Sequence, residues 1–277
     1  MKRSTIARMN GTAGFALIDL SISVLIGSAI LGGFVGMFSS RMNSQHTAES
    51  EYGIREARQA LVSYAMVHGR LPCPASPAMV SGQPNAGIAG EYQNEECAHG
   101  FFGVLPWATL GLPELDAWGN RLAYRVSRDM SQTSEACSED PAAPRSTCLA
   151  PPTRTYSSTP TQDALGVREL VWANGVVERT EPIANGLAAV VFSAGPNGAL
   201  AFNRAGMKRA AVNAIGMEYE LKNATPSSVT FYASPADRRG PSCAPGVGAA
   251  ACGFDDIVAW VSRGEILVAL AKAGYQF

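Results

Sequence analysis

A predominantly apolar run, residues 15–38, limits what this chain can fold into more than any other feature, and Asp19 is its only charged side chain. A helix needs about 20 consecutive apolar residues to cross the hydrocarbon of a bilayer. The charges before the run, Lys2, Arg3 and Arg8, are all basic, which predicts that the N-terminus stays in the cytoplasm and that the rest is exported. No signal-peptidase site of the A-x-A kind follows, so we expect the helix to be retained. A carboxylate in hydrocarbon is costly, so Asp19 should have a partner.

The apolar run continues into a segment with helical periodicity. Residues 39–70 contain no proline, and apolar residues recur at helical spacing up to His68, after which Gly69 and Pro72 predict the end of the helix. The remaining chain has short apolar runs separated by glycine, proline, asparagine and aspartate, a pattern typical of strands and turns. The strands expected are residues 122–126, 169–173, 188–193, 229–233 and 257–261.

The expected fold class is therefore α+β. A long N-terminal helix, membrane-spanning in its first half, would pack on an antiparallel β-sheet with disulfide-stapled loops. We expect four segments in chain order: a cytoplasmic leader at residues 1–14, the membrane-spanning helix at 15–38, its amphipathic continuation at 39–70 and a periplasmic globular domain at 71–277.

All six cysteines follow the apolar run, which favours disulfides formed in an oxidising compartment. Six cysteines allow 15 pairings, and the sequence does not choose among them. Pairing of neighbours along the chain closes the shortest loops, and we adopt it as a hypothesis: Cys73 with Cys97, Cys137 with Cys148, and Cys243 with Cys252. Buried free thiols or a metal site are the alternatives, although no Cys-x-x-Cys motif supports a metal.

Composition argues against two function classes. The 22 basic and 23 acidic residues give a net charge of -1, and no basic stripe is present, so we expect no nucleic-acid partner. The chain has three histidines and lacks the common hydrolase, metalloprotease, phosphate-loop and dinucleotide-binding motifs, so we predict that it is not an enzyme. An enzyme tethered to a membrane stays a rival hypothesis, and it predicts a deep pocket with convergent polar groups.

The basic leader, Gly14 and the following sequence FALID resemble the N-terminal signal of the type IV pilin and pseudopilin family. The resemblance implies that a prepilin peptidase cleaves after Gly14 and methylates the new N-terminus, Phe15. It also implies that Asp19 occupies the fifth mature position, where the family usually has a glutamate that meets the N-terminal ammonium of a neighbouring subunit. Such pairing offsets the cost of burying two charges. The alternative is an uncleaved signal anchor, with Asp19 at the cytoplasmic interface.

Three further stretches extend the resemblance to the pseudopilins of type II secretion. They are LPELDAWGNRLAYRVS at residues 112–127, VVFSAGPNGAL at residues 190–200 and FDDIVAWVS at residues 254–262. In major pseudopilins the corresponding turn and later aspartates help to form a calcium site, and the matching oxygen donors here are Ser193, Asp255 and Asp256. Asn197 stands where an aspartate would be expected. The alternative is that Asp255 and Asp256 cap a turn and stay solvated. No other cofactor is expected.

Together these features predict a minor pilin or pseudopilin, a structural subunit of a type II secretion pseudopilus or a type IV pilus. We hypothesise a position at the filament tip. The expected location is the inner membrane, crossed once, with a periplasmic C-terminal domain, and a filament after assembly. The expected partners are other pilin or pseudopilin subunits, the prepilin peptidase and the inner membrane. An uncleaved, membrane-anchored periplasmic binding module is the alternative function.

Overall fold

The computed structural model describes residues 15–93, 96–132, 164–173, 176–211, 217–234 and 254–275. The chain divides into two compact units, residues 1–45 and residues 46–277, and the division falls within helix α1, Phe15–His68. All described residues of the first unit belong to α1, whereas the second unit contains all the described strands.

In the first unit α1 exposes apolar side chains: Leu20, Val24 and Leu25 are 65%, 63% and 67% exposed. Side chains of the predicted membrane span are described for residues 20–28, and serines and a glycine interrupt this stretch. Spanning a membrane requires about 20 mostly apolar residues in succession. Among the described residues, no helix has the length and apolar character to cross a membrane. This finding contradicts the expected membrane-spanning helix at residues 15–38 and the expected single-pass inner-membrane location.

In the second unit the remainder of α1 buries one face. Ile54, Ala57, Leu61 and Ala65, spaced three or four residues apart, are all at most 2% exposed. This spacing places them on one side of a helix, as the sequence pattern predicted. Gly69, with φ of +67°, follows the helix, and its N–H donates to the carbonyl of Ala65 at 2.8 Å. A left-handed residue in this position ends a helix while satisfying one of its last carbonyls.

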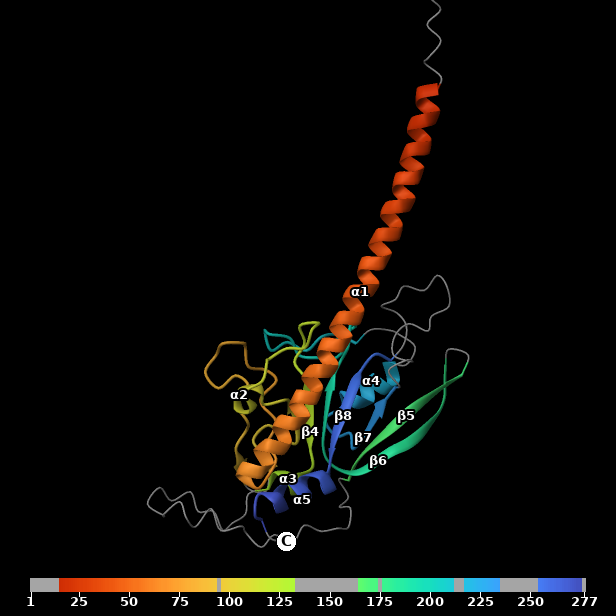
Figure 1. The fold of residues 1–277 in the computed structure, drawn as a ribbon. Helices are drawn as coiled ribbons and strands as arrows, with labels where there is room; N and C mark the ends of the chain where they lie inside the picture. Colours follow the sequence, from red (N-terminus) through yellow and green to blue (C-terminus); the bar gives the residue numbers. More distant parts are fainter. Residues whose placement is uncertain are drawn as a thin grey trace, which may run out of the picture. The chain divides into compact units, whose positions relative to one another are not determined.

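The main sheet of the second unit has six strands, five of them in the order β3 (Phe102–Val104), β4 (Ala123–Val126), β6 (Val176–Ser193), β5 (Leu165–Ala173) and β7 (Thr230–Ala233) (Figure 1). The sixth, β8 (Ile257–Ser262), pairs with β6. A separate ribbon joins β1 (Tyr92–Gln93) to β2 (Glu96–Cys97).

The expectation of a purely antiparallel sheet is wrong at one pairing. Strands β5 and β7 are parallel, with Val167 opposite Phe231, whereas the other pairs of the main sheet are antiparallel. Parallel neighbours need a long crossover rather than a tight turn. Here the chain leaves β6, passes through helix α4 (Met217–Asn223) and then enters β7.

Each predicted strand corresponds to a strand of the structure. Residues 122–126, 229–233 and 257–261 overlap β4, β7 and β8, while residues 169–173 and 188–193 are the C-terminal parts of β5 and β6. The first part of β6 was missed because Arg179, Glu181 and Pro182 break the apolar pattern, although this part pairs with β5 along its length.

Both faces of the sheet are covered. Along β6, Ala189 and Val191 join a buried cluster with Leu61 of α1, and Val190 and Phe192 join a second cluster on the opposite face. Alternation of this kind follows from the two-residue period of a strand. The first cluster also contains Ile266 and Leu270 of helix α5 (Arg263–Lys272), and Tyr219 of α4 packs on the second. Two short helices, α2 (Trp107–Leu110) and α3 (Arg128–Ser131), lie in the connections around β4.

One expected disulfide is confirmed: Cys73 and Cys97, 24 positions apart in the sequence, are bonded. Cys137, Cys148, Cys243 and Cys252 lie outside the described residues. The pairings of Cys137 with Cys148 and of Cys243 with Cys252 therefore stay predictions.

Candidate metal centre

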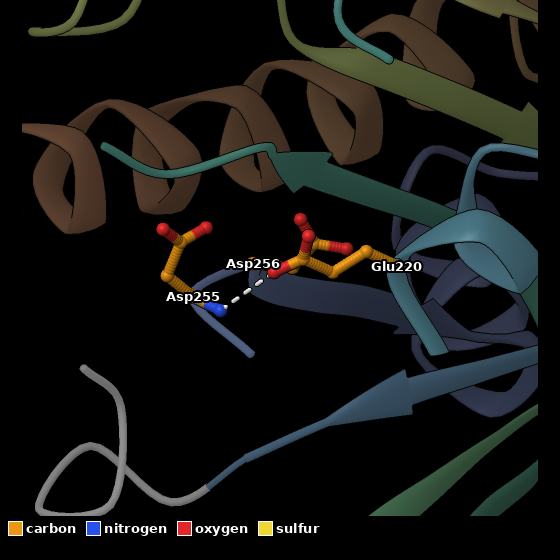
Figure 2. A group of neighbouring side chains, drawn as sticks. All are labelled: Glu220, Asp255 and Asp256. Atoms are coloured by element: carbon orange, nitrogen blue, oxygen red, sulfur yellow. Dashed lines mark hydrogen bonds between the residues drawn. The ribbon is translucent and has the colours of Figure 1, made fainter. Parts of the chain in front are cut away.

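The site begins where β6 ends and β8 starts. These strands are antiparallel neighbours, and Ser193 is paired with Ile257, so the turn after β6 lies beside residues 254–256. Helix α4 supplies a third component, Glu220, which is 2% exposed. Figure 2 shows Glu220 reaching from α4 toward Asp255 and Asp256.

Three carboxyl groups meet at this point. One oxygen from each of Glu220, Asp255 and Asp256 lies within 4.8 Å of the others. Within the described residues, none of the three forms an ion pair with a lysine or arginine. The cluster thus concentrates potential negative charge without a basic side chain to neutralise it.

Neutral donors hold two of the carboxylates in place. The backbone N–H of Asp255 donates to Oε1 of Glu220 at 2.9 Å, the dashed bond in Figure 2. The amide of Asn197 donates to both oxygens of Glu220 at 3.1 and 3.2 Å. Its backbone N–H donates to Oδ2 of Asp255 at 3.1 Å. Donors aimed at these oxygens favour the charged form, so they oppose part of the cost of burial.

Asp256 is the most deeply placed member of the cluster, 2% exposed. Its Oδ2 accepts a bond of 2.8 Å from the amide of Asn223, one helical turn beyond Glu220 on α4. The same asparagine accepts from the N–H of Tyr232 in β7 at 2.7 Å. Asn223 therefore ties α4 to β7 and to the start of β8.

Burial raises the pKa of all three carboxyl groups. For Asp255 it raises the pKa to about 8, with the negative charge of Glu220 as the second cause. The pKa of Asp256 lies well above its usual value, through burial and then the charge of Glu220. Burial also raises the pKa of Glu220, while the hydrogen bonds from Asp255 and Asn197 lower it. Without a cation, the cluster therefore retains protons near neutral pH.

The donor set suits a hard divalent cation. Carboxylate oxygens are the ligands that calcium prefers, and bound calcium would supply the positive charge that the cluster lacks. Oδ1 of Asp255 is buried and has no hydrogen-bond partner among the described residues, so it is available to a ligand. The residues present thus fit calcium, with Glu220, Asp255 and Asp256 as the side chains that would hold it.

Ser193, which the resemblance implied as a ligand, has other partners. Its hydroxyl donates to Oδ2 of Asp116 at 2.6 Å and accepts from the N–H of Gly195 at 3.2 Å. Oδ1 of Asp116 accepts from the N–H groups of Trp118 and Asn120. The structure thus brings Ser193 next to the cluster along the chain but joins its hydroxyl to the Asp116 turn. Asp255 and Asp256, in contrast, do lie together.

Glu220 was not predicted from the sequence. This residue lies in a short helix, and no spacing links it to aspartates 35 and 36 positions further on. Asn197, noted as a departure from the family pattern, contacts both Glu220 and Asp255. The pairing of β6 with β8 places Asn197 beside Asp255, and that pairing cannot be read from the local sequence around Glu220.

The predicted processing residues lie at or beyond the edge of what the structure describes. Gly14 is outside the described residues, and Phe15 is the first residue of α1. Asp19 lies in the first turns of α1, and its side chain is outside the described part. Cleavage, methylation and the role of Asp19 stay predictions.

No protein-family model matches the chain, and no curated protein or solved structure matches it either.

Proposed function

We propose that this protein is a minor pilin or pseudopilin, a structural subunit of a type II secretion pseudopilus or a type IV pilus. One observation carries the proposal. Basic residues precede Gly14 and the sequence FALID follows it, as in the N-terminal signal of this family. Cleavage after Gly14 would remove the basic leader and leave a subunit that starts at Phe15.

The described first part of α1 supports assembly with other helices. The exposed apolar side chains are Leu20, Ile22, Val24, Leu25 and Ile26. Successive residues of a helix are about 100° apart, so these five side chains point to all sides of α1. Serines and Gly27 lie among them, but exposed apolar side chains in this number are stabilised when other molecules cover them. The covering molecules proposed here are the corresponding helices of neighbouring subunits.

Asp19 is the proposed register element of this assembly. Its carboxylate would meet the ammonium group of a neighbouring subunit's N-terminus, and in an apolar helix bundle an unpaired charge of either sign is strongly disfavoured. A shift by one helical turn would leave both charges unpaired. We propose that the subunit occurs in low copy number near the filament tip.

Calcium in the carboxylate cluster would stabilise the second unit of this subunit. A cation there would join α4 to the start of β8, two segments that are distant in sequence. The proposed role is structural, and it involves no reaction of a bound substrate.

The test is the mass of the N-terminal peptide of the mature protein, isolated from cells with and without a prepilin peptidase. We expect a peptide that begins at N-methylated Phe15 and that is lost without the peptidase. Gly14→Val should prevent its formation, whereas Gly11→Val, a matched change within the leader, should permit it. An intact Met1 in both strains would contradict the proposal. The tip position would be contradicted if purified filaments contained the protein along their length at the abundance of a major subunit.

A further inference from the structure

A pocket of about 250 Å³ lies within the second unit, between residues 49–56 of α1 and the loop at residues 112–117. Leucines form its apolar wall: Leu105, Leu112, Leu115 and Leu122. Small-molecule sites usually enclose about 300 to 1,000 Å³, so this pocket suits a ligand smaller than most cofactors. None of the residues described above in the carboxylate cluster lines it.

Gly53 keeps the helical side of the pocket open. It lies in the interior of α1, where glycine costs about 1 kcal/mol relative to alanine. A Cβ built at this position would meet no atom within 4 Å. Neither a close approach of another chain segment nor an unusual backbone angle therefore requires glycine here. The missing side chain instead adds space to the pocket.

Two anchors hold the opposite wall. The buried hydroxyl of Ser50 in α1 accepts from the N–H of Ala117 at 3.2 Å. Asp116, the preceding residue, has oxygens bonded to Ser193 and to two backbone N–H groups of its own turn. The loop is thus fixed to α1 and to the end of β6. The pocket is formed by the fold itself and does not need a ligand to create it.

All charged residues that line the pocket are acidic. Glu49 and Glu56 extend from α1, and Asp116 lies on the loop side, whereas no lysine, arginine or histidine is among the residues that line the pocket. Of the neighbouring helical arginines, Arg58 forms an ion pair of 2.7 Å with Glu265. Arg55 lies over the ring of Tyr52, a lining residue, with 5.9 Å to its centroid.

Tyr52 adds an aromatic group to this acidic rim. It is 56% exposed and also lines the pocket. Tyr52 and Glu56 lie one turn apart on α1. A hydrogen bond between their side chains raises the pKa of the Tyr52 hydroxyl. Because the guanidinium of Arg55 already lies over the Tyr52 ring, the carboxylates of Glu49 and Glu56 are the groups that would attract an organic cation.

We propose that this pocket binds a small organic cation with a compact apolar body, such as a primary alkylammonium. The apolar body contacts the leucine wall in the space left by Gly53, and the ammonium group lies at the rim beside Glu49 and Glu56. Charge complementarity selects this occupant over a fatty acid or a neutral alcohol of the same length. The inference is independent of filament assembly, because every residue it uses belongs to the second unit.

Binding of hexylammonium, 1-hexanol and hexanoate to the full-length chain tests the proposal, measured by calorimetry and by chemical shifts of labelled protein at low ionic strength. We expect hexylammonium to bind at least about tenfold more tightly than hexanol, and hexanoate not to bind. Equal binding of the amine and the alcohol would overturn the proposal, and so would absence of amine binding.

Three variants locate the site. Gly53→Leu should fill the pocket and abolish binding, while the thermal midpoint stays at or above that of the parent because leucine favours the helix. Glu49→Gln combined with Glu56→Gln should weaken hexylammonium binding about tenfold. Glu218→Gln removes an exposed carboxylate from α4 and should have no effect. Retention of binding in folded Gly53→Leu protein would overturn the proposal.

Discussion

Two groups of acidic side chains in the second unit differ in surroundings rather than in chemistry. Glu220, Asp255 and Asp256 are packed between α4, β6 and β8, with amide donors from Asn197 and Asn223. Glu49 and Glu56 extend from α1 at the rim of a pocket, the first exposed and the second half-buried. In the first group burial raises the pKa of the carboxyl groups and opposes their ionisation.

The comparison shows how burial changes the role of a carboxyl group. Buried carboxyl groups must be neutralised by protons or by a cation, so their contribution to stability depends on pH and on calcium. Exposed carboxylates contribute little to stability, but they remain available to an external cation. The following measurements test this contrast, beginning with the largest expected effect.

The free energy of unfolding should fall as pH rises from about 5 to 8 in the presence of a chelator. The pKa of Asp255 is about 8 in the folded chain against 3.8 for the free side chain, so between these values the folded state holds a proton that the unfolded state lacks. The stabilisation is complete below the lower value and is lost as pH rises through the upper one. The slope is about 1.4 kcal/mol per pH unit for each such group.

Urea unfolding at several pH values measures this slope. Asp255→Asn keeps an acceptor for the N–H of Asn197 but removes the charge, so the slope should become shallower. Glu49→Gln is the matched change at the exposed rim and should leave it unchanged. A free energy of unfolding that rises across this range in the parent would show that the buried cluster is already charge-compensated.

Calcium should reverse the loss of stability at pH 8. A ligand that binds only the folded state at 100 times its Kd stabilises it by about 2.7 kcal/mol. The thermal midpoint should therefore rise with calcium in the parent, and much less in Asp256→Asn. Glu56→Gln should respond like the parent, and an equal response in all three proteins would place the calcium outside the cluster.

Two glycines, one beside each acidic group, should respond to alanine in opposite directions. At Gly195, with φ of +59°, a Cβ would overlap the backbone oxygen of Asp255, and a left-handed conformation alone costs about 1–2 kcal/mol. Gly195→Ala should therefore lower the free energy of unfolding by about 2 kcal/mol or more. Gly53→Ala, in open space on a helix, should raise it by about 1 kcal/mol. Chemical denaturation of both variants measures the difference, and destabilisation by Gly53→Ala would contradict the open pocket.

Neutralising the pocket rim should have the smallest effect on folding. Glu49→Gln should change the free energy of unfolding by less than about 0.5 kcal/mol, because its carboxylate is exposed to solvent. The same substitution should reduce hexylammonium affinity. A large loss of stability would mean that the rim has a structural role. Both acidic groups would then contribute to the free energy of unfolding.

Local patterns predicted several parts of the second unit. The spacing of Ile54, Ala57, Leu61 and Ala65 indicated the buried face of α1, and these residues are buried. The apolar run at residues 188–193 indicated a strand because this C-terminal part of β6 is covered on both faces. The hypothesis that neighbouring cysteines pair was correct for Cys73 and Cys97. Each of these signals depends on neighbours in the chain or on a single face.

Other parts depended on contacts between distant residues. The parallel pairing of β5 with β7 has no local signature, because parallel and antiparallel strands can have the same apolar pattern. The bond from Ser193 to Asp116 joins positions 77 residues apart, through the pairing of β4 with β6. The expected membrane span was inferred from an apolar run, and no described helix meets that description.

The sequence by itself determined the helical face, most of the strand positions, the aspartate turn at Asp116 and the pair of aspartates before β8, because each depends on interactions within a few residues. Only the tertiary structure decided that Glu220 joins those aspartates, that Ser193 turns to Asp116 and that a pocket opens beside Gly53. Packing of α1, α4 and the ends of β6 and β8 sets those distances, and burial by that packing raises the pKa of Asp255 and its neighbouring carboxyl groups.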